Sequence, residues 1–364
     1  MQSKESRRSF IRKLSAGLSG IATGTSGLVG CASQAMKTGG AGLQRRTAPR
    51  SGASPVSFTT GKDQRETAYQ VLKPLESEII KAIGDKQVVI KINSGQIRED
   101  WWLNATDAKW VKGILDFLKP INDRQVIVAE STAAGAQSTH RGFENYGYMP
   151  LLDEYNIKFV DLNDRPTQNR WILGESRHPL AINIIDMFLD PNVYIISATR
   201  LKSHNTVIAT LSLKNVVMAS PINRYRQKQA KGRNEKPKMH SGRARGLSYN
   251  MFRLASMGIQ PDLAVLDGVV GMEGDGPVRG TPVEQGVAVA STDWLAADRL
   301  GVELMGMDYD EVKHLHWCAD AGMGQDNLTK MKIIGPEYKQ HITTYKLHQN
   351  IEQQREWIHE DYPA

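Results

Sequence analysis

The chain has 364 residues, of which 40% are hydrophobic and 23% are charged; this composition is that of an ordinary soluble globular protein, and the length suffices for one large core or two modest lobes. The net charge is +7, but residues 1–60 hold nine Lys or Arg against one acid, so the remaining 304 residues sum to −1. A near-neutral folded region removes the main support for nucleic-acid binding, and no stretch of about 20 residues is apolar enough for a transmembrane helix.

The two cysteines exclude several kinds of site. Cys31 and Cys318 lie far apart, and no Cys-x-x-Cys pattern occurs. A cysteine-ligated iron–sulfur cluster and a zinc ribbon within one chain are therefore excluded, and so is a disulfide framework.

Residues 1–30 predict a signal peptide. Residues 6–12 read S-R-R-S-F-I-R, which resembles the twin-arginine consensus with Arg12 in place of the usual Lys, and a weakly apolar segment rich in Gly and Thr follows. We therefore expect the twin-arginine translocase to export the protein across the cytoplasmic membrane, to the periplasm or cell envelope. The alternative is a basic amphipathic start to a cytosolic protein.

Residues 31–60 predict a leader between the signal and the folded domain. Leu28-Val29-Gly30-Cys31 resembles a lipobox, so cleavage before Cys31 would leave a thiol that carries lipid and contacts the membrane. The alternative is a chance small-residue cleavage site with a spare cysteine. The segment up to residue 60 contains Gly, Ser, Thr, Pro and Arg without apolar periodicity, which is typical of a disordered tether.

Residues 61–340 alternate between helical and strand patterns. Helices are predicted at residues 63–84 (with a break at Pro74), 104–119, 143–155, 294–306 and 309–322, and strands at residues 87–93, 125–131, 157–162, 192–200, 261–270 and 285–291. This alternation predicts an α/β fold with a mainly parallel sheet covered by helices on both faces, or two Rossmann-like lobes. The polar tail, residues 341–364, is expected to be helical.

Polar residues follow most of the predicted strands. Ligands of open α/β sheets bind outside the carboxyl ends of the strands, so these residues are candidates for a site. They are Lys91, Asn93, Glu130, Ser131, Arg200, Lys202, His204, Asp267 and Asp293. The alternative is that they cap loops and helices, and this is favoured for Asp293, which precedes an apolar helix. Asp298, within that helix, is a candidate partner for a neighbouring Lys or Arg.

The densest set of candidates lies in residues 201–215. Lys202, His204, Lys214 and Asn215 lie in or beside an apolar stretch. A buried lysine needs a carboxylate, an anionic ligand or a covalent role, because desolvation opposes its charge. If the segment were helical, the ten residues from His204 to Lys214 would span nearly three turns and place both on one face. The alternative is a surface lysine and a hydrogen-bonded core histidine.

The basic segment 222–245 contains His240. It holds nine Lys or Arg and a single acid, which is typical of a solvated loop. A lid over an anionic substrate is the alternative.

A glycine-rich loop follows the predicted strand at residues 261–270. Gly274 and Gly276 permit close backbone approach, but the pattern matches neither a Walker A motif nor a Rossmann fingerprint. Glu273 and Asp275 are candidate acid/base groups or ligands for a hard metal, and solvated acids in a tight turn are the alternative.

These segments resemble a known family. VVIKIN, LKSHNTVIATLSLKN, the downstream His240, VLDGVVGMEGDGPVRG and ASTDWLAADRLGVELMG occur in the order found in the family that shares the domain of unknown function 362. The resemblance runs from about residue 85 to about residue 335. It implies no activity, and the ferredoxin module of some relatives is not carried over, because the cysteines for its cluster are lacking.

A second resemblance is to the nickel-pincer lactate racemase family. In that family a histidine, a lysine ten residues later that holds the cofactor, and a further histidine share a site between two α/β lobes. The resemblance assigns these three positions to His204, Lys214 and His240.

These patterns favour an exported envelope enzyme that acts on a small anionic substrate, with a metal or an organic cofactor left unidentified. The predicted catalytic residues are His204, Lys214, His240 and Glu273. The predicted binding residues for substrate or cofactor are Lys91, Asn93, Lys202, Asn215, Asp267, Gly274, Asp275 and Gly276. The alternative function is a non-catalytic lipoprotein that binds an anionic ligand.

Overall fold

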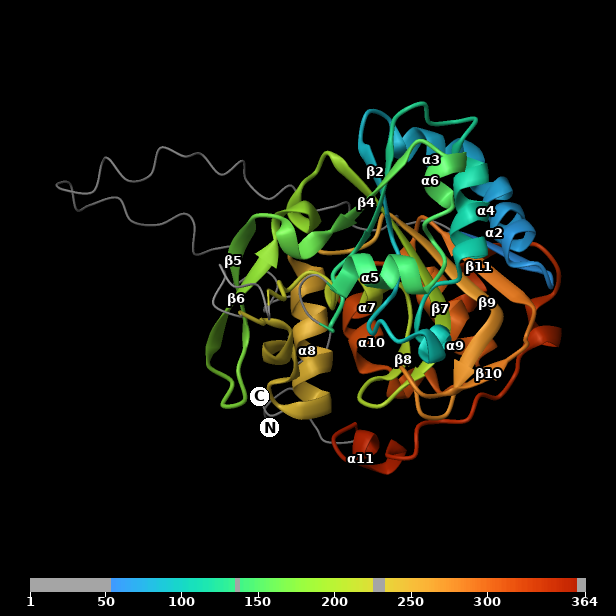
Figure 1. The fold of residues 1–364 in the computed structure, drawn as a ribbon. Coiled ribbons are helices and arrows are strands. Elements are labelled where there is room, and N and C mark those ends of the chain that lie inside the picture. Colours follow the sequence, from blue (N-terminus) through green and yellow to red (C-terminus); the bar gives the residue numbers. More distant parts are fainter. Residues whose placement is uncertain (1–53, 135–137, 225–232, 359–364) are drawn as a thin grey trace, which may run out of the picture.

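The computed structural model describes residues 54–134, 138–224 and 233–358 (Figure 1). The twin-arginine motif, the lipobox and most of the expected tether lie outside the described residues, so what was predicted for them stays a prediction.

The strands are β1 (Pro55–Thr60), β2 (Gln87–Lys91), β3 (Val126–Glu130), β4 (Ile157–Asp161), β5 (Thr167–Leu173), β6 (Pro179–Ile185), β7 (Val193–His204), β8 (Ile208–Thr210), β9 (Leu263–Glu273), β10 (Thr281–Val283), β11 (Val287–Ser291) and β12 (Lys332–Ile334). The α-helices are α2 (Gln64–Leu72), α3 (Glu76–Ile83), α4 (Ala108–Leu118), α5 (Ser138–Asn145), α6 (Leu151–Glu154), α7 (Ser212–Val217), α8 (Arg243–Ser256), α9 (Trp294–Leu304), α10 (Lys313–Asp320) and α11 (Ile351–Arg355).

One sheet of ten strands runs through the described part of the chain. Its order is β12-β1-β11-β9-β7-β2-β3-β4, with β10 paired to β9 and β8 paired to β7. Strands β9, β7, β2, β3 and β4 are parallel to their neighbours in that series, whereas β11 is antiparallel to both β9 and β1. The predicted α/β fold with a mainly parallel sheet is confirmed, and strands β5 and β6 form a separate two-stranded antiparallel sheet.

Helices cover both faces of the sheet because its central strands are apolar on both sides. In β7, Ile195 packs into one core with helices α7 to α10, and its neighbours Tyr194 and Ile196 pack into a second core with α2, α3 and α4. In β9, Leu266 belongs to the first core and Val265 to the second. Successive strand residues point to opposite faces, so one continuous apolar run supplies both cores.

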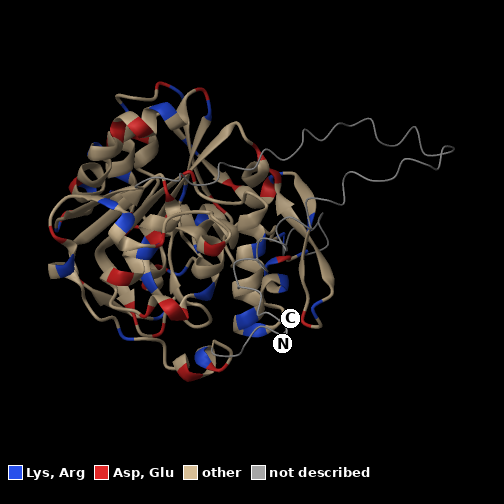
Figure 2. Ribbon diagram, turned by 180° about the vertical axis from the view of Figure 1, so that it is seen from behind, with Lys and Arg blue, Asp and Glu red and all other residues tan. Residues whose placement is uncertain are grey.

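Residues of both charge signs are spread along the described chain. In Figure 2, Lys and Arg are interspersed with Asp and Glu along the ribbon. None of the helices within the described ranges is long and apolar enough to span a membrane.

The folded domain begins before residue 61, because the last residues of the expected tether form strand β1. This strand lies between β11 and β12 in the sheet, with Ser57 opposite Ala290 and Val56 opposite Ile333. Val56 and Phe58 are 0% and 1% exposed. Val56 and Phe58 are two positions apart and therefore lie on the same face of the strand. Two apolar residues surrounded by Gly, Ser and Thr are too short a pattern to predict a strand from the sequence.

The C-terminal tail is not a helix over most of its described length, which corrects the prediction for residues 341–358; residues 359–364 lie outside the described residues. Only α11 is helical, and residues 342–348 follow the surface without regular structure. The tail is nevertheless part of the fold, because Tyr345 is 2% exposed and its hydroxyl donates to Oε1 of Gln285 at 2.9 Å.

Candidate functional site

A buried ion pair lies where two central parallel strands end. Lys91 is the last residue of β2 and Glu130 is the last residue of the adjacent β3, and Lys91 Nζ lies 2.7 Å from Glu130 Oε1. The same carboxylate oxygen accepts the backbone N–H of Ser131 at 2.6 Å. Burial lowers the pKa of Lys91, and the charge of Glu130 opposes that shift.

Three further predicted residues join this pair in one hydrogen-bond network. Asn215 Oδ1 accepts from both Lys91 Nζ and Asn93 Nδ2, each at 3.0 Å. Lys202 Nζ donates to Asn93 Oδ1 at 2.5 Å and to the backbone oxygen of Asn104 at 2.7 Å. Burial is the main reason that the pKa of Lys202 lies well below its usual range, and nearby positive charges add to it. The structure thus brings together four of the predicted binding residues.

Residues 201–215 form a hairpin and a short helix, not the continuous helix considered from the sequence. Strand β7 extends to His204, β8 pairs with it antiparallel, and α7 then carries Lys214 and Asn215 back toward the sheet. His204 and Lys214 therefore approach each other through a chain reversal rather than along one helix face.

Two aspartates of the α9 region act as backbone caps. Asp293 accepts the N–H of Ala296 at 3.2 Å, which confirms the predicted N-cap. Asp298 accepts the N–H groups of Ser212 and Leu213 at 2.8 and 3.0 Å, so it holds the start of α7 instead of pairing with a Lys or Arg as predicted. Burial raises the pKa of Asp298 to about 7. This cap fixes the helix that carries the candidate lysine.

Lys214 is buried without a counter-charge. Lys214 is 8% exposed, and burial alone lowers the pKa of its amine to about 7. Within the described ranges no oxygen accepts a hydrogen bond from its Nζ. A lysine in this state is stabilised by an anion or reacts as a neutral amine.

Basic side chains surround Lys214. Its charge contributes, after burial, to the lowered pKa of three histidines, His204, His240 and His314. Lys236 is also 8% exposed, has a pKa lowered to about 7 chiefly by burial, and donates from Nζ to the backbone oxygen of Met218 at 2.8 Å. We refer to Lys202, His204, Lys214, Lys236 and His240 as the basic cluster.

Two members of this region were missed from the sequence. Lys236 lies in the basic segment expected to be a solvated loop, yet it follows directly on the buried Glu235 and starts a short 3-10 helix that ends at His240. His314 lies in α10, and its Nδ1 is buried with no hydrogen-bond partner among the described residues. Nothing in the sequence around Lys236 distinguishes this buried lysine from the other Lys and Arg residues of the basic segment 222–245.

The three acidic candidates, Asp267, Glu273 and Asp275, each contact a different part of the fold. Asp267 is fully buried, lies 3.5 Å from Arg200 Nη1, and has a pKa raised to about 6 by burial. Glu273 accepts the backbone N–H of Lys346 at 2.9 Å and so holds the C-terminal segment. Asp275 is half exposed and lies 3.8 Å from Nε2 of His348. A catalytic role for Glu273 stays a prediction, and its contacts in the structure are with the tail.

Gly274 and Gly276 pack the β9–β10 hairpin closely against the end of β7. Gly274 has a φ of +70°, donates its N–H to the oxygen of Lys346 at 2.7 Å, and accepts from Ser203 Oγ at 2.9 Å. A Cβ on Gly276 would lie 2.1 Å from the backbone oxygen of Ser203. The close approach predicted for these glycines is thus made by β7 in this structure.

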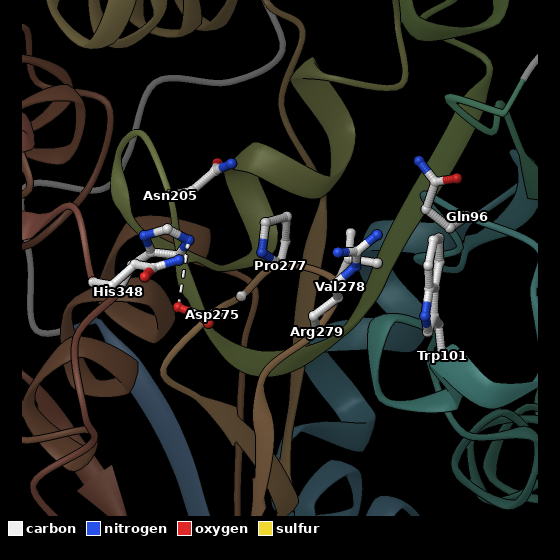
Figure 3. A pocket seen from close by; sticks show the side chains of 10 residues that line it. Gln96, Trp101, Asn205, Asp275, Pro277, Val278, Arg279 and His348 are labelled. Carbon is white, nitrogen blue, oxygen red and sulfur yellow. Dashed lines mark ion pairs between the residues drawn. The ribbon is translucent and has the colours of Figure 1, made fainter.

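A pocket of about 430 Å³ opens beside His204 (Figure 3). Gln96 and Trp101 lie on one side of it, Asn205 and His348 lie on the other, and residues 275–279 lie between them. None of the lysines of the basic cluster lines this pocket. His204 lies between the two regions in the chain, because its neighbour Asn205 lines the pocket.

The C-terminal segment holds the hairpin that carries His204. Gln354, which is 3% exposed, donates from Nε2 to the backbone oxygen of His204 and accepts the N–H of Ile208, each at 2.9 Å. Asn350 Nδ2 donates to the oxygen of Asn205 at 2.8 Å. Ile208 has a φ of +67°, which is rare for a β-branched residue, so the turn depends on these contacts.

Among the described residues, no group of three or more His, Cys, Asp or Glu is arranged to hold a metal ion. The site is therefore defined by lysine, histidine and asparagine side chains at the carboxyl edge of a parallel α/β sheet.

The chain belongs to the family described as Domain of unknown function (DUF362), whose profile matches residues 88–303. A thylakoid-associated protein of Synechocystis sp. is 29% identical over 166 residues, which are 45% of this chain and 47% of that protein. The chain thus matches about half the length of this curated relative.

Two solved structures are similar at low sequence identity. The lactate racemase apoprotein from Thermoanaerobacterium thermosaccharolyticum is 13% identical, with a TM-score of 0.40 over 69% of this chain and 57% of that chain. A protein from Thermotoga maritima is 11% identical, with a TM-score of 0.35 over 60% of this chain and 54% of that chain.

Proposed function

We propose that this protein is an enzyme that acts on a small anionic substrate held at Lys214. The observation that carries the proposal is the burial of Lys214 with no hydrogen-bond acceptor among the described residues and no carboxylate among the causes of its lowered pKa. The neighbouring Lys202 and Lys236 are bases and supply no negative charge, and Glu130 is already paired with Lys91. A carboxylate or phosphate group of a ligand supplies the missing negative charge.

Two histidines beside this lysine support acid/base chemistry. Their lowered pKa values leave His204 and His240 neutral at pH 7. The backbone N–H of Thr206 donates to Nδ1 of His204 at 3.0 Å, so the proton of the neutral ring is on Nε2, which acts as a donor. His240 lies at the exposed end of a short 3-10 helix and is the candidate proton acceptor. A donor and an acceptor next to a held anion are what proton transfer to or from a substrate requires.

The first prediction concerns binding of probe anions to the full-length protein. Calorimetric titration with inorganic phosphate and short monocarboxylates at low salt is expected to detect binding to the wild type. Lys214→Met should weaken it about tenfold or more, because a charge-assisted contact is lost. The exposed Lys330 provides the matched control, and Lys330→Met should bind like the wild type. Wild-type affinity in Lys214→Met, or no binding of any probe, would reject the proposal.

A non-catalytic anion-binding lipoprotein is the rival function. His240→Asn separates the two, because it removes a proton acceptor and leaves the lysines in place. Wild type and variant are each incubated with a pool of small organic acids and phosphates, and the pool is followed by NMR. Turnover by the wild type and none by a variant that still binds would support the enzyme; no turnover by the wild type would favour the binding protein.

An organic cofactor joined to Lys214 is a second candidate, favoured by the pKa of about 7, which leaves much of the amine neutral and nucleophilic at pH 7. We expect protein purified from its native source to carry a mass adduct on the peptide that contains Lys214. Lys214→Arg should lack the adduct while it keeps the charge. An unmodified peptide in the native protein would leave reversible anion binding as the function of this lysine.

We also propose that the protein is exported and anchored by lipid on Cys31, on the sequence motifs alone. Replacement of both Arg7 and Arg8 by Lys is expected to retain the precursor in the cytoplasm, because the translocase reads the paired guanidinium groups. Fractionation and immunoblotting measure this, and Cys31→Ser should release mature protein from membranes. Normal export of the double variant would contradict the signal assignment.

A further inference from the structure

The pocket beside His204 contains a guanidinium group that no carboxylate of the described chain neutralises. Arg279 lies in the loop between β9 and β10, and its guanidinium stacks over the ring of Trp101 at 5.2 Å from the centroid. It makes no ion pair or side-chain hydrogen bond among the described residues. Asp100, whose pKa its charge helps to lower, is already paired with Arg98 at 2.7 Å. Arg279 is exposed, so its donors are open to the pocket and to solvent while its guanidinium lies over Trp101.

The loop that carries Arg279 is fixed to the end of the strand that carries His204. Its backbone N–H donates to the oxygen of Asp275 at 3.1 Å, which closes a turn around Gly276. Gly276 in turn lies against the backbone of Ser203, the residue that precedes His204. Figure 3 shows Arg279 in the middle of the pocket, with Trp101 on one side and His348 on the other. Asn205, which lines the pocket, directly follows His204 of the basic cluster in the chain.

The pocket is larger than an anionic head group alone requires. Its volume of about 430 Å³ lies in the range of pockets that hold complete small-molecule ligands. Its polar side chains include two cationic or potentially cationic groups, Arg279 and His348, and one carboxylate, Asp275, which lies next to His348. A guanidinium with open donors favours a planar carboxylate or a phosphate.

We propose that Arg279 binds the second anionic group of a ligand whose first anionic group is held at Lys214. The substrate class is then a small molecule with two anionic groups, a dicarboxylate or a phosphorylated carboxylic acid, with its body in the pocket. This inference rests on the proposed function, because it takes Lys214 as the site of the first group. Arg279 is in this view a specificity-determining residue.

The test compares dianions with monoanions of equal length on the full-length protein. Calorimetry measures the dissociation constants of dicarboxylates of four to eight carbons, the monocarboxylates of the same lengths, and 3-phosphoglycerate. For at least one length the wild type should prefer the dianion about tenfold or more. Arg279→Gln should remove that preference and leave monoanion affinity unchanged, and Arg279→Lys should retain part of it. The exposed Arg177, at the tip of the β5–β6 hairpin, provides the control variant Arg177→Gln, which should match the wild type.

Each outcome separates this inference from the proposed function. Equal loss of both affinities in Arg279→Gln, unchanged dianion preference in it, or no dianion preference in the wild type would overturn the role of Arg279 and leave the Lys214 site intact. Failure of the wild type to bind any anion, or binding that does not depend on Lys214, would overturn the proposed function itself. Circular dichroism of each variant confirms that it is folded.

Discussion

Replacing Phe58 with alanine in the full-length chain is expected to lower the free energy of unfolding by about 3–5 kcal/mol. Phe58 is 1% exposed, lies in β1 and packs in the core on the α7–α10 face of the sheet, so the shorter side chain leaves a cavity on that face. Urea denaturation followed by tryptophan fluorescence measures the change. Thr60, exposed at the end of the same strand, gives the control Thr60→Ala, expected to stay within about 0.5 kcal/mol of the wild type.

The burial of β1 in the sheet also determines how far the chain can be truncated at its N-terminal side without loss of stability. A chain that starts at residue 54 keeps β1, whereas a chain that starts at residue 61 exposes the edges of both β11 and β12. We expect the longer fragment to melt near the temperature of the full-length protein and the shorter one to lose most of its cooperative transition. Equal melting temperatures would show that β1 is dispensable and that the tether extends as far as the sequence suggested.

Most strands predicted from the sequence lie at the centre of the sheet, and β4, which was also predicted, is an edge strand. Strands β2, β3, β7 and β9 are buried on both faces, so each is a continuous apolar run that stands out from its surroundings. The missed strands are short or lie outside this centre, such as β8, β10 and β12, or alternate with exposed polar residues, as in β5. Their formation depends on strands distant in sequence, which a local pattern does not record.

The sequence analysis also missed a helix break that is caused by the backbone conformation of one glycine. The single helix predicted at residues 143–155 is two helices, α5 and α6, separated by Gly147 with a φ of +73°. The apolar positions of the two pieces happen to continue one helical spacing, so periodicity alone does not reveal the turn. A glycine followed by a proline three residues later was the available signal.

Site residues at the end of a single predicted strand could be predicted from the sequence. Site residues that segments distant in sequence bring to the same place could not. Lys91 and Lys202 follow from the rule that ligands bind at the carboxyl ends of strands. The contribution of Lys236 depends on how the chain returns after residue 232, and that of Gln354 depends on a tail that packs on β7 and β8. Neither is encoded by residues near the strand ends.

The last prediction is that Lys214→Met stabilises the protein at low pH while it removes anion binding. The pKa of Lys214 is about 7 in the folded state and lies near 10.4 in an unfolded chain. Between these values the unfolded chain binds more protons than the folded one, so this group makes stability rise with pH across that window. Below pH 7 the lysine is charged in both states, and the folded state bears the full cost of the buried charge, on the order of a few kcal/mol.

Methionine has a similar shape without the charge, so the variant is free of that cost. The gain in melting temperature should be largest at pH 6 and should shrink as the pH approaches 10, because the lysine of the folded wild type then loses its proton and no charge is buried. The pKa of His240, measured by NMR, should rise in the variant because the charge of Lys214 lowers it in the wild type. Binding a probe anion should raise the melting temperature of the wild type at pH 6 but not that of Lys214→Met. A variant less stable than the wild type at pH 6 would mean that the ammonium group has a partner in the folded protein, and the buried lysine would then be a structural residue rather than the place where a substrate binds.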